Sequence, residues 1–403
     1  MQRIGSVSVT TRLTIEKVTK VFSDHPERAL ALLAAGASKD RVHAELGAVV
    51  ALNGISLSVP AGAIYIIMGL SGSGKSTLAR CVNRLIEPTA GRILLDGEDI
   101  VTASPQRLRE LRRTRMSMVF QHFALLPHKS VVENVEFGLK LRGMPAPQRR
   151  KKAQEFLAIV GLEKWAGYRP VSLSGGMRQR VGLARALATD ADLLIMDEAF
   201  SALDPLIRSE MQDELLQLQK LLHKTILFIT HDFQEALKLG TRIAVLSDGA
   251  VVQEGAPQEI VLDPRNDYVA AFTRDVDRAR LFDAASVMLP AAPIVIGADG
   301  ALSIPPRMEG RQAFVIDGGG RFLGAIAASD AASLRGKDPG ALSLPREAAI
   351  PMKAKLIEVA RALNAAEQLA VTDEDGRLVG CIRGEQVLAR IGGRPSAAPP
   401  AAR

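Results

Sequence analysis

The sequence predicts an α/β fold organised around a phosphate-binding loop and followed by a smaller α+β domain. A glycine-rich run lies between an apolar segment and a helical one, and later apolar segments end in acidic or histidine residues. Near the C-terminus, a strand-turn-strand pattern occurs twice. Strands that alternate with helices favour a sheet covered by helices on both faces. The length of 403 residues, 47% of them hydrophobic, allows two or three domains.

The glycine-rich run Gly69–Thr77 has the form GxxxxGK[S/T] and follows the apolar, β-branched segment Ala63–Met68. Residues 77–85 have helical spacing, and the motif requires this strand-loop-helix context. Backbone N–H groups of such a loop converge on the β-phosphate, Lys75 reaches the β and γ oxygens, and Ser76 can bind Mg²⁺. The sequence therefore predicts a bound nucleoside triphosphate. Its expected contacts are Gly69, Ser71, Gly72, Ser73, Gly74, Lys75, Ser76 and Thr77.

Two more apolar strands end in residues that suit the same nucleotide site. The strand Leu193–Met196 is followed by Asp197, which can hold the water shell of Mg²⁺, and by Glu198, which can polarise an attacking water. Taken alone, this pair is more often an ordinary strand end, but a phosphate loop in the same chain favours the catalytic interpretation. The strand Thr225–Thr230 ends at His231, on the edge where parallel sheets bind ligands.

A second helix start suited to anions is predicted near the middle of the chain. Within the run Leu173–Arg180, Gly175 and Gly176 begin a helix that continues through 181–188. The N-terminus of a helix carries a partial positive charge and free N–H groups. The region around it, from about Ser130 to Thr189, is expected to be largely helical. One chain therefore carries two helix ends that can bind phosphate.

Composition narrows the possible partners. The net charge of +7 is spread thinly and aromatic residues make up only 4%, so we expect no nucleic acid. The cluster Arg149–Lys152 is interpreted as a solvated helix face, with lipid contact as the alternative.

No apolar run approaches the roughly 18 residues of a membrane span, and the N-terminus lacks a signal-peptide core, so a cytosolic chain is expected. We expect no disulfide between Cys81 and Cys381.

In order along the chain, these motifs resemble those of the ATP-binding cassette (ABC) ATPases. The resemblance covers about residues 12–275, with LSGGM in place of the commoner signature LSGGQ. It implies a RecA-like core, an antiparallel β subdomain and an α-helical subdomain. It also implies a head-to-tail homodimer in which the signature helix of one subunit closes on the γ-phosphate of the other. The matching motifs are the phosphate loop, Gln121 of the Q-loop, the signature Leu173–Met177, Asp197–Glu198, the D-loop Ser201–Asp204 and the switch His231.

The resemblance also implies a role for each matching residue, with ATP and Mg²⁺ as cofactors. Phe22 falls where the family stacks an aromatic ring on adenine, and a core residue at a strand end is the competing interpretation. The implied catalytic residues are Glu198, His231 and Gln121, the implied metal ligands are Ser76, Gln121 and Asp197, and the further nucleotide contacts are Phe22, Ser174, Gly175, Gly176 and Asp204.

Within the family, the chain is most similar to ATPase subunits of importers for glycine betaine, proline betaine or choline. The inserted residues 23–47, expected as two short helices, and the run 178–213 contribute to this resemblance. It implies a membrane permease and a separate periplasmic or extracellular binding protein as partners, at the cytoplasmic face of the inner membrane. One alternative is an ABC ATPase of ribosomes or DNA, which usually has two cassettes or a long coiled coil. Another is a nucleotide sensor without catalysis, against which Glu198 and His231 argue.

The C-terminal part contains one pattern twice. Gln312–Asp317 with Arg321–Gly324 returns as Gln368–Asp373 with Arg377–Gly380, each read as strand, turn, strand and then helix. The pair resembles a tandem CBS module. An amphipathic helix expected at Lys353–Asn364 precedes the second copy and has no counterpart before the first.

The predicted domains are therefore an ABC ATPase at 1–275 and a tandem CBS module at 276–393, followed by a disordered Pro/Ala-rich tail at 394–403. The CBS module is expected to gate transport in response to salt. An inert dimerising appendage is the alternative.

Overall fold

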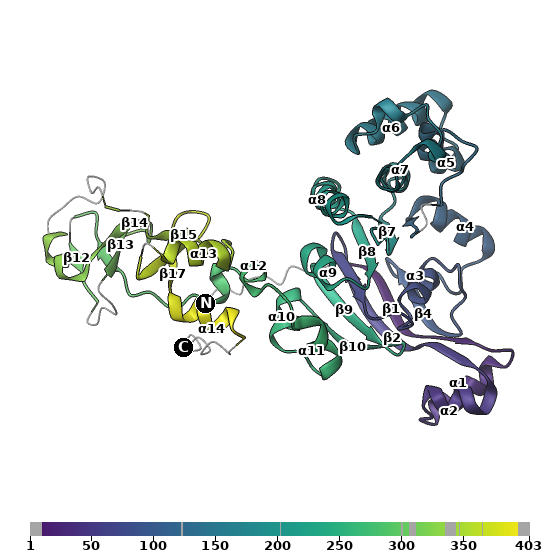
Figure 1. Ribbon diagram of the computed structural model, residues 1–403, viewed down its shortest axis with the longest axis horizontal. Coiled ribbons are helices and arrows are strands. Elements are labelled where there is room, and N and C mark those ends of the chain that lie inside the picture. The colour runs from purple at the N-terminus through teal and green to yellow at the C-terminus, as the bar shows by residue number, and fades with distance from the viewer. Residues whose placement is uncertain are drawn as a thin grey trace. The chain divides into compact units, whose positions relative to one another are not determined.

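The computed structural model divides the chain into two compact units, Met1–Arg274 and Asp275–Arg403, drawn as ribbons in Figure 1. Each unit has its own buried core. The tail predicted at 394–403 lies outside the described residues. The structure describes residues 10–121, 124–201, 203–299, 301–305, 312–334, 344–345, 347–364 and 366–393.

The first unit is built on a six-stranded sheet in the order β10-β9-β3-β8-β7-β6. The strands from β9 to β6 pair in parallel, while β10 pairs antiparallel with β9. Every residue of β3, β7 and β8 is buried, as expected for central strands covered on both faces. The strands are β3 (Ile64–Met68), β6 (Met116–Val119), β7 (Leu193–Asp197), β8 (Thr225–Thr230), β9 (Arg242–Ser247) and β10 (Ala250–Gly255).

A second sheet of the first unit is antiparallel and has the order β2-β1-β4-β5. Side chains of β1, such as Leu13 and Ile15, pack with Leu78 and Cys81 of α3 in the main core of the unit. This core lies between the two sheets and holds the helix that follows the phosphate loop. The elements are β1 (Thr11–Phe22), β2 (Val49–Pro60), β4 (Ala90–Leu95), β5 (Glu98–Asp99) and α3 (Lys75–Val82).

The two helices expected within residues 23–47 are present between β1 and β2. Ser38 caps the second helix, and Gly47 ends it with a φ of 65°. Ala29 and Val42, one from each helix, are buried against the adjoining ends of β1 and β2. The helices are α1 (Pro26–Ala34) and α2 (Lys39–Leu46).

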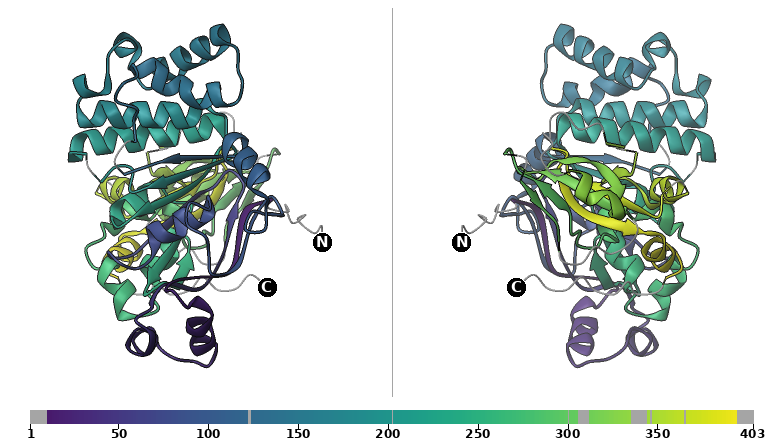
Figure 2. Two further views of the ribbon diagram at one scale, coloured as in Figure 1. Left: turned by 90° about the vertical axis from the view of Figure 1, so that its right-hand side faces the viewer. Right: turned by 90° about the vertical axis from the view of Figure 1, so that its left-hand side faces the viewer.

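Three helices form a subdomain of their own, at the opposite end of the first unit from α1 and α2 (Figure 2). Val135, Leu157 and Val181 come from different helices and meet in its core. The helical region expected between Ser130 and Thr189 is thereby confirmed. The elements are α5 (Val131–Leu141), α6 (Ala146–Ile159) and α7 (Gly175–Ala188), with the 3₁₀ turns η1 (Glu163–Trp165) and η2 (Pro170–Ser172).

Five more helices complete the first unit. None of the helices in the described ranges is long and apolar enough to cross a bilayer. The helix α3 begins two residues before the predicted start and ends at Val82 instead of Leu85, because Arg84 takes a left-handed φ of 55°. The remaining helices are α4 (Pro105–Thr114), α8 (Pro205–Leu222), α9 (Phe233–Leu239), α10 (Pro257–Leu262) and α11 (Asp267–Thr273).

The second unit contains two small sheets, β12-β11-β13-β14 and β15-β16-β17. Its strands are β11 (Ile294–Ile296), β12 (Leu302–Ser303), β13 (Gln312–Asp317), β14 (Phe322–Ala327), β15 (Ala349–Pro351), β16 (Gln368–Thr372) and β17 (Leu378–Arg383). Its helices are α12 (Arg278–Leu281), α13 (Leu356–Leu363) and α14 (Gly384–Ile391), with the 3₁₀ segments η3 (Ala284–Ser286) and η4 (Ala328–Leu334).

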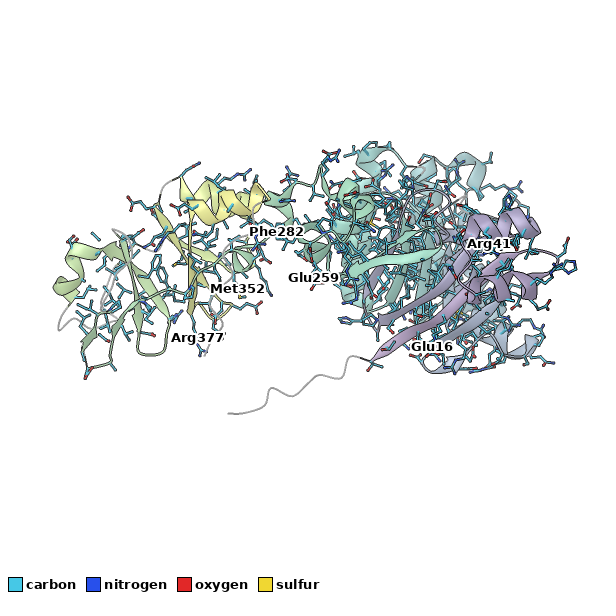
Figure 3. All side chains as sticks on the ribbon, turned by 90° about the horizontal axis from the view of Figure 1, so that it is seen from below. Glu16, Arg41, Glu259, Phe282, Met352 and Arg377 are labelled. Carbon is cyan, nitrogen blue, oxygen red and sulfur yellow. The ribbon has the colours of Figure 1, made fainter. Side chains whose placement is uncertain are left out.

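The sequence repeat corresponds to two equivalent hairpins, β13–β14 and β16–β17. In the first turn Asp317 accepts a hydrogen bond from Arg321 N, and in the second Asp373 accepts one from Arg377 N, whose side chain is labelled in Figure 3. The two turns also bond each other reciprocally through the backbone: Phe322 N–Gly376 O is 2.9 Å and Leu378 N–Gly320 O is 3.0 Å. The repeats are therefore paired about a local two-fold relation.

The prediction that each hairpin continues into a helix is confirmed, but the two helices differ in type. The α-helix α14 follows β17, whereas the 3₁₀ segment η4 follows β14. Residues of the first copy include Ser329 and Asp330, whose side chains bond each other, and such residues compete with helical backbone bonds. The predicted helix at Lys353–Asn364 begins only at Leu356, because β15 and a turn occupy the preceding residues.

Candidate functional site

The phosphate loop joins β3 to α3 and turns at two glycines. Gly69 and Gly74 have φ angles of 153° and 99°, and a Cβ at Gly74 would lie 2.5 Å from the carbonyl oxygen of Ala51. Only glycine meets both demands at this position. The hydroxyl of Ser73 is buried and has no hydrogen-bond partner within the described chain. The loop is thus a backbone cradle containing an unsatisfied polar atom, which fits a phosphate chain.

Lys75 is the first residue of α3, and its side chain folds back over the loop. Its Nζ donates a 2.8 Å hydrogen bond to the carbonyl oxygen of Leu70, and the residue is 4% exposed. Burial lowers the pKa of Lys75, while the carboxylates of Glu198 and Asp197 act in the opposite direction. An ammonium held by a neutral carbonyl can exchange it for phosphate oxygens, which form stronger, charge-assisted bonds.

Ser76 and Asp197 form a second pair beside the loop. The hydroxyl of Ser76, in the first turn of α3, donates a 2.8 Å hydrogen bond to Asp197 Oδ1 at the end of β7. Arg80 lies 3.8 Å from the other carboxylate oxygen. Burial raises the pKa of Asp197, and the Ser76 hydrogen bond and the Arg80 charge oppose that rise. A hydroxyl facing one carboxylate suits Mg²⁺, which takes few protein ligands when phosphates and water supply the others.

Gln121, Glu198 and His231 meet beyond the ends of three neighbouring strands. They follow β6, β7 and β8, which are adjacent and parallel. Gln121 Nε2 lies 3.3 Å from Glu198 Oε2, and His231 Nδ1 lies 3.4 Å from the same oxygen. Parallel strands deliver the residues after their carboxyl ends to one edge of the sheet, so side chains distant in sequence become neighbours.

Glu198 is fixed by its backbone. Its N–H donates to Ile229 O at 3.0 Å, and its carbonyl accepts hydrogen bonds from both the N–H and the hydroxyl of Ser201. Its φ of 47° is left-handed, a conformation that non-glycine residues adopt rarely and often at functional sites. The side chain contacts Gln121 and His231. Because 18% of it is exposed, it can also bind a water molecule.

The signature residues are placed at the start of α7. Ser174 caps this helix through its hydroxyl, which accepts from Met177 N. A Cβ at Gly175 would meet nothing within 4 Å, whereas a Cβ at Gly176 would lie 2.7 Å from Ile207. In the described part of the chain, no hydrogen bond or ion pair joins residues 174–176 to the phosphate loop. The space beside Gly175 at this helix end is therefore open.

Phe22 ends β1 and is 45% exposed, so the alternative interpretation as a core residue is wrong. The ammonium of Lys20 lies 4.9 Å from its ring centroid. The ring lines a cavity of about 370 Å³ at the junction with the inserted helices. On the paired strand β2, Ala51 contacts Gly74 of the phosphate loop, which places this end of β1 near the nucleotide site.

The structure gives less information about the remaining predicted nucleotide contacts, which are Ser71, Gly72, Thr77 and Asp204. Ser71 and Gly72 are exposed on the phosphate loop, and Thr77 is half-buried in α3. The carboxylate of Asp204 accepts a 3.1 Å hydrogen bond from Ile207 N and caps α8.

Two residues at the site were not predicted from the sequence. Arg80 approaches Asp197, and the hydroxyl of Tyr268 accepts a 2.9 Å hydrogen bond from Leu70 N in the phosphate loop. Arg80 lies one turn after Ser76 on the predicted helix, and this spacing could have indicated it. Tyr268 lies 198 residues from Leu70, in a stretch without a motif, so no local pattern marks it.

Comparison with known proteins shows the family of the chain. The family model described as ABC transporter matches residues 52–201. The glycine betaine/carnitine transport ATP-binding protein of Listeria monocytogenes is 43% identical over 95% of this chain and 98% of its own length. The glycine betaine/proline betaine transport system ATP-binding protein of Escherichia coli is 44% identical, over 92% of this chain and 95% of its own length.

A solved structure shares the fold of the first unit. The ATP-binding cassette MJ0796, solved as a dimer in a post-hydrolysis state bound to ADP and Pi, superimposes with a TM-score of 0.52 and 32% identity. The match covers 61% of this chain and 98% of that cassette. The family model, the relatives matched over nearly their full length and the fold all indicate the same family. The chain belongs to the ABC transporter ATP-binding subunits, in the branch of the glycine betaine transport ATP-binding proteins, and is an ATPase.

Proposed function

We propose that the chain is the ATP-hydrolysing subunit of an importer whose cargo is glycine betaine, proline betaine or choline. The observation that carries the proposal is the meeting of Gln121 and His231 at one oxygen of Glu198. A protein that only senses nucleotide does not need a carboxylate held ready for water. The relatives named for betaine transport match nearly the whole chain and supply the cargo class.

The proposed reaction follows from the side chains around the phosphate loop. Lys75 leaves the Leu70 carbonyl and binds the β and γ oxygens of ATP. Ser76 and Asp197, with Gln121, would hold Mg²⁺, which would neutralise charge on the phosphates when bound. Glu198 accepts a hydrogen bond from water and directs its oxygen to the γ-phosphorus as the bond to the β-phosphate oxygen breaks. ADP and phosphate are the products.

The proposed active form is a head-to-tail homodimer. The start of α7 presents N–H groups beside Gly175, where the same chain places no atom within 4 Å of a Cβ. A helix start suits an anion, and the γ-phosphate bound by a second copy would provide it. The solved cassette that covers the first unit is dimeric. Ser174 and Gly176 would join Gly175 in this contact, and Asp204 would lie near it.

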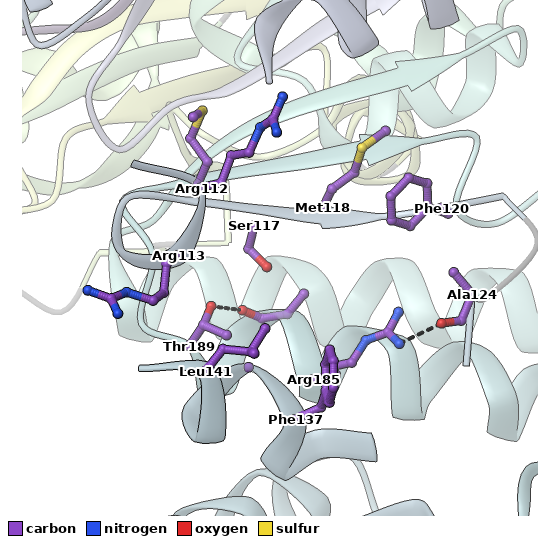
Figure 4. A pocket seen from close by; sticks show the side chains of 13 residues that line it. Arg112, Arg113, Ser117, Met118, Phe120, Ala124, Phe137, Leu141, Arg185 and Thr189 are labelled. Carbon is purple, nitrogen blue, oxygen red and sulfur yellow. Dashed lines mark hydrogen bonds between the residues drawn. The ribbon is translucent and has the colours of Figure 1, made fainter. Parts of the chain in front are cut away.

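A membrane permease is the proposed partner, and a cavity between the core and the helical subdomain is its proposed docking site. The cavity measures about 310 Å³ and is lined by apolar side chains such as Met116, Phe120 and Phe137. Figure 4 shows that Arg112, Arg113 and Arg185 also line it. A lining that combines apolar and basic side chains suits a short amphipathic helix with an acidic end. Docking there would place the chain at the cytoplasmic face of the membrane.

One residue that lines this cavity is the neighbour in sequence of Gln121. Phe120 lines it and is followed directly by Gln121, which contacts Glu198. Arg185, also in the lining, donates a 2.6 Å hydrogen bond to the carbonyl of Ala124 on the same loop. Movement of a docked permease segment would therefore shift the loop that carries Gln121, and this provides the coupling between transport and hydrolysis.

Vesicles that contain the chain with its permease and binding protein are expected to accumulate labelled glycine betaine only when ATP is present. An excess of unlabelled proline betaine or choline should reduce the uptake if either shares the pathway. The Glu198→Gln variant serves as the control with intact subunits. Normal ATPase activity without uptake of any of the three amines would contradict the proposal, and co-purification with ribosomes or DNA would favour the non-transport alternative.

The second unit is proposed to be a tandem CBS module that gates transport. Its two hairpins use equivalent Asp317 and Asp373 turns and bond each other reciprocally, which supports a paired module. Electrostatic contacts between this unit and lipid or permease would weaken as salt rises, because the screening length is about 8–10 Å at physiological ionic strength. Release of the contacts would then activate the transporter.

Removal of residues 275–403 is expected to yield a transporter that works at low salt and has lost its activation threshold. Uptake measured in vesicles across a salt series tests this, with a chain shortened only by residues 394–403 as control. An activation curve identical to that of the full chain would leave the second unit without a gating role.

A further inference from the structure

A tyrosine far from every sequence motif contacts the phosphate loop. The hydroxyl of Tyr268, in α11, accepts a 2.9 Å hydrogen bond from Leu70 N and donates a 3.1 Å hydrogen bond to Leu246 O in β9. Leu246 O is the atom that would lie 2.2 Å from a Cβ at Gly69. The hydroxyl therefore ties the first turn of the loop to the strand on which that turn rests.

The bond is made to the residue that also holds the catalytic lysine. The carbonyl of Leu70 accepts hydrogen bonds from Lys75 Nζ at 2.8 Å and from Ser73 N at 3.2 Å. The side chain of Leu70 is 56% exposed, so packing does little to fix this residue. The backbone orientation of Leu70, and with it the resting position of Lys75, therefore depends on polar contacts in the two peptide units that flank its Cα, one at its N–H and the other at its carbonyl.

Tyr268 is itself held by a rigid support. The buried amide of Gln253 in β10 bonds the loop before α11 twice, to Asp263 O and to Arg265 N, each at 2.9 Å. Asn266 caps α11, and Val269 anchors it with no exposed surface. A side chain on such a support can impose a position on a neighbouring loop instead of following it.

The same helix reaches the other side of the catalytic site. The ring of Tyr268 packs edge-on against that of Phe272, with 5.2 Å between the ring centroids. The ring centroids of Phe272 and Phe233 are 6.2 Å apart. Phe233 is the first residue of α9 and lies two residues after His231. One aromatic row thus connects the phosphate loop to the helix that follows the switch histidine.

We propose that Tyr268 is a positioning residue of the ATPase site, which sets the backbone of Leu70 through its N–H so that Lys75 and the loop N–H groups are arranged for the β- and γ-phosphates. The hydroxyl acts before phosphate arrives and touches no reacting atom. Its loss therefore weakens nucleotide binding and leaves the hydrolytic step, which depends on Glu198, largely unchanged.

The test is Tyr268→Phe in the full chain, which removes only the hydroxyl and keeps the ring on Phe272. A single hydrogen bond of this kind is worth about a 3- to 10-fold change, so the KM for ATP is expected to rise by about that factor with kcat nearly constant. Tyr168→Phe, which makes the same change at an exposed ring of the helical subdomain, is the matched control. Titration with a fluorescent ATP analogue should show the same loss of affinity.

A structural role alone would give a different result. In that case Tyr268→Phe would lower the thermal unfolding midpoint and leave the KM equal to that of Tyr168→Phe. A KM unchanged from wild type overturns the assignment, whatever happens to stability. A raised KM with an unchanged unfolding midpoint supports it. A fall in kcat at constant KM would also overturn it, because that result would assign the hydroxyl to the hydrolytic step.

Discussion

Replacing Glu198 with glutamine is expected to abolish most ATP turnover and to leave ATP binding intact. The change keeps the size of the side chain and leaves the backbone bonds to Ile229 and Ser201 in place. It removes the negative charge that polarises water, and loss of such a group typically lowers the rate by about 10²- to 10⁴-fold. Steady-state hydrolysis and titration with a fluorescent ATP analogue measure the two effects separately.

The matched control for this variant is Glu45→Gln, on the exposed face of an inserted helix where Glu45 pairs with Arg41. It makes the same chemical change away from the site and should leave turnover unchanged. Retention of more than about half of the wild-type rate by Glu198→Gln would be incompatible with a role in activating water.

The substitution Gly175→Asp is expected to stop hydrolysis without harming the fold. A Cβ at this position meets no atom within 4 Å, and an acidic residue in the first turn favours the helix dipole, so α7 should be as stable as before or slightly more so. In the proposed dimer, however, the new carboxylate faces the γ-phosphate bound by the partner, and repulsion between the two anions prevents closure. ATP hydrolysis and the thermal unfolding midpoint are the measurements.

Gly175→Ala separates bulk from charge, because it adds the Cβ in the same open space and should retain most of the activity. Gly176 is unsuitable for this comparison, since a Cβ there would lie 2.7 Å from Ile207. Full hydrolysis by Gly175→Asp, with ATP bound normally, would show that the start of α7 takes no part in the reaction.

The sequence was sufficient for the part of the site that lies at the ends of parallel strands. Asp197, Glu198 and His231 each follow an apolar run, and a parallel sheet brings such positions together regardless of the length of chain between them. Gln121 also follows a strand, but its role is assigned only through the family resemblance. The structure places it 3.3 Å from Glu198.

The contact of Tyr268 could not be predicted, for a physical reason. It depends on how α10 and α11 fold back onto β10, through buried apolar residues such as Val269 and the two hydrogen bonds of the buried Gln253 side chain. Neither periodicity nor spacing encodes a bond between a side chain and a distant loop. The cavity beside Phe120 was missed in the same way, because its walls come from separate subdomains.

The second unit shows where local pattern and local propensity diverge. The equivalent Asp317 and Asp373 turns follow directly from the repeated residues. A helix is predicted after each hairpin and is present after both, but it is 3₁₀ after the first and α after the second. A repeat in sequence therefore fixed the strands and turns, while the residues that differ between the copies determined the helices.

The central claim is that each ATP site combines the phosphate loop of one copy with the α7 start of another, and mixed dimers test it most directly. Lys75→Ala disables the loop, and Gly175→Asp disables the helix start. Each variant alone forms dimers with no intact site. In a mixed dimer of the two, both defects fall in one composite site and the other site is intact. Mixing the two inactive proteins is therefore expected to restore ATP hydrolysis, and a mixture that remains as inactive as either variant alone, with mixed dimers shown to form, would contradict the composite site.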